Sequence, residues 1–146
     1  MIESENQQPE LKKKILTPKQ KKQNNFQLGS LGEELACQYL VTKNYKILDR
    51  NIRVKNNEID VIALDQQNNE LVFIEIKTRS NTTFGNPDLA VTNKKLQSMA
   101  LVAKWYMKLN HYYLDFRFDI IAIHYLKDDA KKLNPQIEHF ENISWP

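Results

Sequence analysis

Two apolar runs, residues 58–64 and 71–77, are the feature that most constrains what this chain can fold into. Both are rich in β-branched residues, and the polar segment 65–69 between them is the pattern of two strands joined in a hairpin. Residues 71–77 are apolar on both strand faces, and such a strand is covered on both sides, in the middle of a sheet. The two runs therefore predict a sheet with helices packed on it.

Helical and extended segments surround this predicted hairpin. Apolar residues at helical spacing predict one helix over residues 26–44 and a second over residues 92–109, with Thr92 as the N-cap of the second. Extended segments are expected at residues 45–54, 115–126 and 137–143. This order predicts an α/β fold of three layers, in which helices flank a central mixed sheet of four or five strands.

Residues 1–25 are rich in Lys, Gln, Asn and Glu, and we expect them to form a disordered basic tail before a folded domain, residues 26–146. The tail carries the whole net charge of +3, because basic and acidic residues balance in the remainder. The charge of the predicted domain is thus neutral evidence about nucleic acid. No apolar run of about 18 residues predicts a membrane span. The lone Cys37 excludes a disulfide framework, no secretory signal is evident, and a cytoplasmic location is expected.

Charged residues interrupt the two central strands. Glu75 and Lys77 share a strand face because alternate side chains point the same way, and Asp60 lies among apolar residues of the preceding strand. Burying such groups is costly unless they are paired or have a chemical task. One interpretation is a structural Glu75–Lys77 ion pair. The other is a metal site for phosphodiester cleavage, in which the two carboxylates bind Mg²⁺ or Mn²⁺ and the lysine orients the attacking water or balances phosphate charge.

The same residues carry a resemblance to a known family. Residues 56–60 (NNEID) and 73–79 (FIEIKTR) resemble the YraN-like family of small bacterial proteins. That family is similar to archaeal Holliday-junction resolvases and belongs to the PD-(D/E)XK, restriction-endonuclease-like superfamily. The resemblance covers roughly residues 26–143, and its further matches, in order, are Gly29-x-x-Gly32-Glu33-x-x-Ala36, Asn51-x-Arg53, Phe84-Gly85-x-Pro87, Ala90-Val91-Thr92 with Lys95, Arg117-Phe118-Asp119 and Ile137-x-His139.

The resemblance implies a restriction-endonuclease-like core with its catalytic site at Asp60, Glu75 and Lys77. It further implies that Glu33, on the first predicted helix, completes the metal shell and that the backbone carbonyl of Ile76 is another ligand. The helical wheel agrees independently, since it places Glu33 at the edge of the apolar face. A solvent-exposed helix carboxylate is the alternative for Glu33.

Other basic and aromatic residues have a structural alternative beside a functional one. Candidates for binding the nucleic-acid backbone are Arg53, Arg79 and Lys95, although a solvated lysine explains Lys95 equally well. Arg117 is expected to pair with Asp119 on the same strand face. We expect four aromatic residues to pack in the core or on a dimer surface rather than to stack on bases: Trp105, Tyr106, Tyr112 and Tyr113.

The residues and the resemblance together predict a Mg²⁺- or Mn²⁺-dependent endonuclease that hydrolyses DNA, with branched or single-stranded DNA as candidate substrates. The alternative is a non-catalytic nucleic-acid-binding or adaptor protein that retains the fold, and a third reading is a purely structural ion-pair network. The resolvase resemblance implies a homodimer, because symmetric cuts need two sites. No membrane partner and no small-molecule cofactor are expected.

Overall fold

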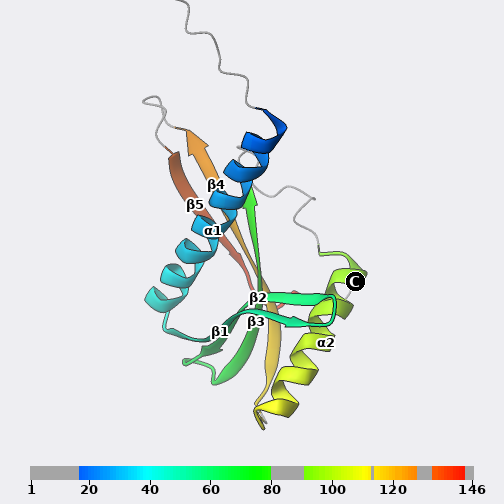
Figure 1. The fold of residues 1–146 in the computed structure, drawn as a ribbon. Helices are drawn as coiled ribbons and strands as arrows, with labels where there is room; N and C mark the ends of the chain where they lie inside the picture. The colour runs from blue at the N-terminus through cyan, green and yellow to red at the C-terminus, as the bar shows by residue number, and fades with distance from the viewer. Residues whose placement is uncertain (1–16, 80–90, 113, 128–132, 144–146) are drawn as a thin grey trace, which may run out of the picture.

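The structure, a computed structural model, describes residues 17–79, 91–112, 114–127 and 133–143. Its elements follow the order predicted from the sequence, with two strands after the second helix (Figure 1): α1 (Pro18–Thr42), β1 (Tyr45–Val54), β2 (Asn57–Asp65), β3 (Glu70–Arg79), α2 (Asn93–Leu109), β4 (Phe116–Lys127) and β5 (Leu133–Phe140). Strands β3 and β4 are parallel and the other neighbours are antiparallel, so the five-stranded sheet is mixed.

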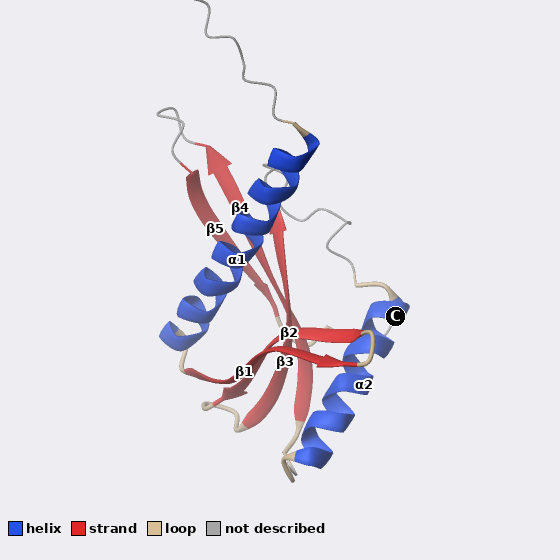
Figure 2. Ribbon diagram, in the orientation of Figure 1, coloured by secondary structure: helices blue, strands red, loops and turns tan. Residues whose placement is uncertain are grey.

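The two helices cover opposite faces of the sheet (Figure 2). Helix α1 packs on one face through Ala36, Cys37 and Leu40, over Val61, Ala63, Val72, Ile74, Ile121 and Ile123. Helix α2 packs on the other face through Met99, Val102, Ala103 and Tyr106, over Ile59, Ile62, Leu71 and Phe73. Strand β3 is therefore covered on both sides, as its apolar sequence predicted. The α/β fold with a restriction-endonuclease-like core is confirmed.

Helix α1 begins eight residues earlier than the apolar pattern predicted, so residues 18–25 are helical and do not belong to a disordered tail. Thr17 and Gln20 form a capping box, and Pro18 occupies the first helical turn, where its missing N–H costs nothing. This part of the helix is polar and exposed, and apolar periodicity cannot reveal such a segment. The rest of the predicted tail, residues 1–16, lies outside the described residues. No helix in the described ranges is long and apolar enough to span a membrane.

Strand β5 also differs from its predicted bounds, since it starts at Leu133 and ends at Phe140. Pro135 argued against a strand at this position, because proline has no backbone N–H to donate to the hydrogen bonds between strands. The strand tolerates it at the edge of the sheet, where it pairs only with β4.

A buried charge network ties the strands together at the end of the sheet where β3 and β4 begin. Arg117, 7% exposed at its side chain, lies 3.0 Å from Asp65, 2.7 Å from Glu70 and 3.0 Å from Asp119. Asp119 is fully buried and also accepts from the backbone N–H of Asn142 and contacts His139 at 2.8 Å. The predicted Arg117–Asp119 pair is confirmed, and it belongs to a larger structural network.

Candidate active site

Strand β2 changes the direction of its side chains at Asp60. Val61 belongs to the core under α1, whereas Ile59 belongs to the core under α2, although residues two apart in a regular strand share a face. Across from Asp60, between the pairs Arg50–Val61 and Ile52–Ile59, Asn51 has a φ of 52°. Asparagine tolerates this left-handed backbone conformation better than most residues do. Asn51 thus marks an irregularity in β1 directly across from the change of direction in β2.

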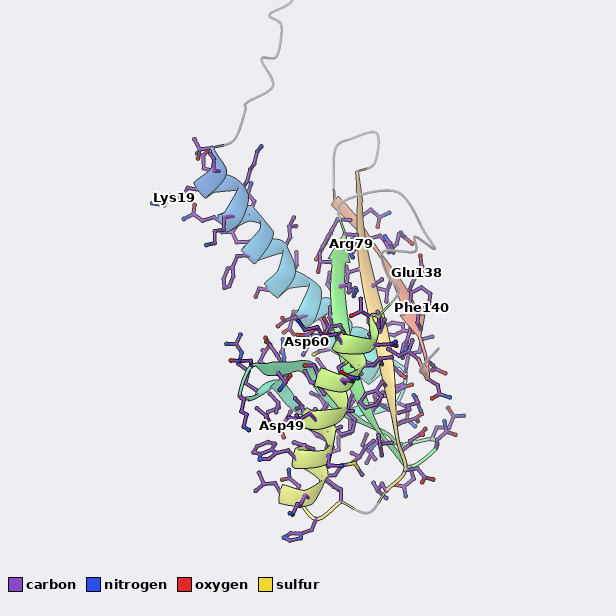
Figure 3. The ribbon with its side chains drawn as sticks, turned by 90° about the vertical axis from the view of Figure 1, so that its right-hand side faces the viewer. Lys19, Asp49, Asp60, Arg79, Glu138 and Phe140 are labelled. Carbon is purple, nitrogen blue, oxygen red and sulfur yellow. The ribbon has the colours of Figure 1, made fainter. Side chains whose placement is uncertain are left out.

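Asp60 lies where β2 and β3 stop pairing. The ladder between them ends at Val61 and Ile74, and Asp60 is the next residue along β2. Its Oδ2 accepts a hydrogen bond of 2.7 Å from the backbone N–H of Ile76. A side-chain contact thus replaces the next rung of the ladder and holds the carboxylate against β3, between the positions of Glu75 and Lys77. Figure 3 shows Asp60 beside the N-terminal end of α2.

Glu75 and Lys77 follow Phe73 on the α2 face of β3, as strand alternation predicted. The Glu75 side chain is 16% exposed, and its Oε2 lies 3.0 Å from Nζ of Lys95, in the first turn of α2. That oxygen is buried and accepts no hydrogen bond of good geometry from the described residues, so its contact with Lys95 is purely an ion pair. A Glu75–Lys77 ion pair was one of two interpretations of the sequence, and the ion pair that Glu75 forms in the structure is with Lys95, between strand and helix.

The electrostatics of the site centre on Asp60. Burial, the nearby charge of Glu75 and, to a smaller extent, that of Glu33 raise the pKa of Asp60 to about 7. The hydrogen bond from Ile76 and the positive charge of Lys95 oppose this rise only in part. Glu33 therefore lies close enough to Asp60 to affect its ionisation, although α1 and β2 are distant in sequence. The carboxylates repel one another in the ligand-free protein.

This donor set fits a hard divalent cation. Two carboxylates destabilise each other, and Glu75 Oε2 has unused acceptor capacity in a buried position. In the part of the chain that the structure describes, no three acidic, histidine or cysteine side chains form a metal-holding group by themselves. Mg²⁺ commonly takes only one or two protein carboxylates and completes its shell with water and phosphate. Asp60 and Glu75 are thus sufficient protein anchors, and direct ligation by Glu33 or by the Ile76 carbonyl stays a prediction.

Gly32 explains how α1 comes close enough for Glu33 to influence Asp60. A Cβ added at this position would collide with Thr78 Oγ1 and contact Ile123. Thr78 is next to Lys77 in β3, so the absence of a side chain at Gly32 sets the spacing between α1 and the strand that carries the site. A Cβ added at Gly29, about one turn earlier, would have no atom within 4 Å.

Gly32→Ala is therefore expected to lower the free energy of unfolding by about 1 to 3 kcal/mol, the usual range for overpacking, because α1 must move away from β3 or Thr78 must shift. Urea unfolding followed by circular dichroism measures the change. Gly29→Ala is the matched control, and it should stabilise the protein by about 0.5 to 1 kcal/mol through helix propensity. Equal effects of the two substitutions would contradict the close-approach role of Gly32.

The predicted nucleic-acid-binding residues have different surroundings. Lys95 faces the site through Glu75, as described above. Arg53 is 73% exposed at its side chain and pairs with Glu58 at 3.1 Å near the tip of the β1–β2 hairpin. Arg79 ends β3 beyond Lys77 and is half-buried (Figure 3). Binding of phosphate by any of them stays a prediction. The left-handed backbone at Asn51 was not predicted, because the apolar pattern carries no signal for it.

Comparison with known proteins places the chain in a family. Residues 32–123 match the family model described as uncharacterised protein family UPF0102. A UPF0102 protein of Syntrophomonas wolfei is 38% identical over 80% of this chain and 99% of its own length. UPF0102 proteins of Thermodesulfovibrio yellowstonii and Geobacter sulfurreducens are 43% and 41% identical, over 80% and 82% of this chain and 95% and 89% of their own lengths. The chain therefore belongs to the UPF0102, or YraN-like, family of the PD-(D/E)XK nuclease superfamily.

Proposed function

We propose that this protein is a Mg²⁺- or Mn²⁺-dependent endonuclease that hydrolyses phosphodiester bonds in DNA. The observation that carries the proposal is the position of Asp60: its hydrogen bond to the Ile76 backbone holds it beside Glu75, although two neighbouring acids raise its pKa to about 7. Such an arrangement costs stability, and costly polar groups cluster at functional sites. A divalent cation held between Asp60 and Glu75 would relieve the repulsion.

Each residue of the site has a role in this proposal. Asp60 and Glu75 would hold the cation, and the chemistry that a divalent cation would supply there is polarisation of the phosphoryl oxygen and activation of water. The Ile76 N–H fixes the direction of the Asp60 carboxylate. Lys77, on the same face as Glu75, orients the attacking water and stabilises the charge that develops on phosphate. Lys95 balances the charge of Glu75 in the ligand-free protein.

One observation favours the alternative, a nucleic-acid-binding or adaptor protein without catalysis. The Glu75–Lys95 ion pair accounts for the strand carboxylate without any metal. In that case DNA binding would need no divalent cation.

The test is cleavage of a panel of linear, single-stranded and four-way-junction DNAs with Mg²⁺ or Mn²⁺. Wild type should cut at least one member, and Glu75→Gln and Lys77→Met should each lower the rate by about 10²- to 10³-fold, the usual loss for one stabilising group. Glu58→Gln is the matched control, because Glu58 is a partly exposed carboxylate in the same strand as Asp60 and pairs with Arg53 near the tip of the hairpin. Binding of DNA by wild type without any cleavage in either metal would support the adaptor instead.

A further inference from the structure

The outer face of α2 and the tip of the β1–β2 hairpin enclose two clefts that meet at Leu101. The first has a volume of about 700 Å³, and its polar lining consists of Asn56, Asn57, Thr92, Lys94, Lys95, Gln97 and Ser98. The second has a volume of about 560 Å³ and is lined mainly by Val54, Lys55, Leu101, Lys104, Trp105 and Lys108. Figures 1 and 2 show the hairpin tip beside α2. We call this continuous surface the α2 groove.

The α2 groove is basic, although the part of the chain after the tail has no net charge. Helix α2 contains four lysines and no acidic residue, and Lys55 adds a fifth from the hairpin. None of the described residues that line the two clefts is acidic. Lysines gathered along one face without intervening acids form an electrostatic path for a polyanion.

The groove also presents an aromatic ring and aliphatic side chains to solvent. Leu101, Trp105 and Leu109 recur every four residues along α2 and are 47%, 43% and 60% exposed. The buried stripe of the helix, which includes Met99, Val102 and Tyr106, lies on its other side. Trp105 is therefore not a core residue, and in the second cleft it lies with Lys104 and Lys108 of α2 and with Val54 and Lys55 of the hairpin tip.

We propose that the α2 groove binds an unpaired nucleic-acid strand, with a base stacked on Trp105 and its phosphates along the lysines. Exposed aromatic rings within a basic groove are the combination by which proteins bind single strands, since every base has a stacking face. A paired base cannot offer that face without leaving its stack. From Lys95 to Lys108 the helix rises about 20 Å, which suits a short site of about four nucleotides.

The position of Lys95 links the groove to the candidate active site. Lys95 lines the groove near the N-terminal end of α2, and its Nζ lies 3.0 Å from Oε2 of Glu75. A strand lying in the groove would thus lead its backbone toward Asp60 and Glu75. The substrate of the proposed nuclease would accordingly be unpaired DNA or DNA with a single-stranded flap, and this assignment rests on the proposed function. Binding of a single strand in the groove does not depend on it.

The positive charge of the groove argues against a second copy of this chain as its occupant, and the exposed ring of Trp105 argues against an acidic peptide. In a symmetric dimer about this face, the same surface patch on each copy would meet, and the lysines at positions 55, 104 and 108 would approach their own copies. Polyanionic phosphate complements them. An acidic peptide would satisfy the lysines but has no general requirement for an aromatic stacking partner.

The experiment measures binding of a fluorescent 12-nucleotide single strand (about three times the expected site) and of a blunt hairpin duplex, in EDTA so that nothing is cut. Single strand should bind more tightly than duplex. Trp105→Ala should weaken single-strand binding by about 5- to 150-fold, the range for one stacked base, and Trp105→Phe should restore most of it. Quenching of tryptophan fluorescence by the strand should persist in Trp145→Phe and disappear in Trp105→Phe.

Lys104→Gln with Lys108→Gln tests the charges. The pair should weaken binding and reduce the slope of log affinity against log salt by about 1.4, at 0.7 for each lost phosphate contact to a single strand. Lys43→Gln with Lys46→Gln removes the same charge from exposed positions outside both clefts and should change affinity less than about twofold.

Several outcomes would overturn the inference: equal affinity for single strand and duplex with no effect of Trp105→Ala, a dimer that Trp105→Ala dissociates in light scattering, or equally tight binding of poly-glutamate. The two proposals fail separately. Strand binding through Trp105 by a protein that cuts nothing would refute only the nuclease. Cleavage of single strands that Trp105→Ala leaves unchanged would refute only the groove.

Discussion

Asp60→Asn is expected to abolish metal-dependent cleavage and, in the same protein, to make the metal-free fold more stable. The amide keeps the shape of the carboxylate and still accepts a hydrogen bond from Ile76, but it carries no charge. The loss of cleavage should be at least about 10²- to 10³-fold. The gain in stability should be about 1 to 3 kcal/mol, the cost of a buried group that lacks sufficient compensation.

The gain should depend on pH in a defined direction. The pKa of Asp60 is raised from 3.8 to about 7 in the folded protein, so the folded state binds the proton more tightly than the unfolded state. The carboxylate therefore destabilises the fold increasingly as pH rises through this interval. Thermal unfolding in EDTA should show Asp60→Asn more stable than wild type at about pH 8 and nearly equal at about pH 4.

Two comparisons keep this prediction specific. Mg²⁺ should raise the Tm of wild type and leave that of Asp60→Asn almost unchanged, because binding to the folded state stabilises it. Glu58→Gln removes a carboxylate of the same strand that pairs with Arg53 and should change stability by less than about 1 kcal/mol. Lower stability of Asp60→Asn at about pH 8 would show that Asp60 contributes to the fold rather than strains it.

Arg117→Ala should produce the largest loss of stability, about 3 to 5 kcal/mol, because it leaves buried carboxylates without their cation. Burial alone would lower the pKa of Arg117, but its hydrogen bonds to Asp119 and Glu70 outweigh that effect and raise it. The guanidinium also donates to Tyr45 and so connects β1, β2, β3 and β4. Equilibrium unfolding in urea measures the loss.

Arg50→Ala is the matched control for Arg117. Arg50 lies 3.0 Å from Glu34, the same distance as Arg117 from Asp119. The side chains of Arg50 and Glu34, however, are 38% and 52% exposed. Such a pair contributes at most about 1 kcal/mol. If both arginine substitutions cost the same, the Arg117 network would be a set of weak contacts instead of the junction that orders the strands.

Local sequence signals predicted most of the fold. The β-branched runs and the short polar loop predicted the β2–β3 hairpin, and Thr92 marked the start of α2, where it accepts from the Lys95 N–H. These signals succeed because strand alternation and helix capping depend on residues near one another in the chain. They failed at the start of α1, where a polar capping box begins a helix without an apolar face.

The charge of the chain shows what local signals miss. The balance of acids and bases after residue 25 suggested no preference for polyanions, yet Lys94, Lys104 and Lys108 lie on the exposed face of α2, and the helix contains no acidic residue. The acids that balance them are elsewhere, and three of them surround Arg117 inside the protein. Of the aromatic residues that we expected in the core or on a dimer surface, Tyr106 is confirmed in the core, whereas Trp105 is exposed and a dimer surface there stays a prediction.

The sequence by itself determined which strands are central and which acidic and basic residues interrupt them, because those patterns repeat every two residues along one strand. Only the tertiary structure decided how these residues meet. The change of face at Asp60, the hydrogen bond to Ile76 and the pairing of Glu75 with Lys95 join residues from separate elements. Glu33 influences Asp60 only because Gly32 lets α1 approach β3 closely. These contacts depend on packing distances between elements, which no pattern within one element encodes.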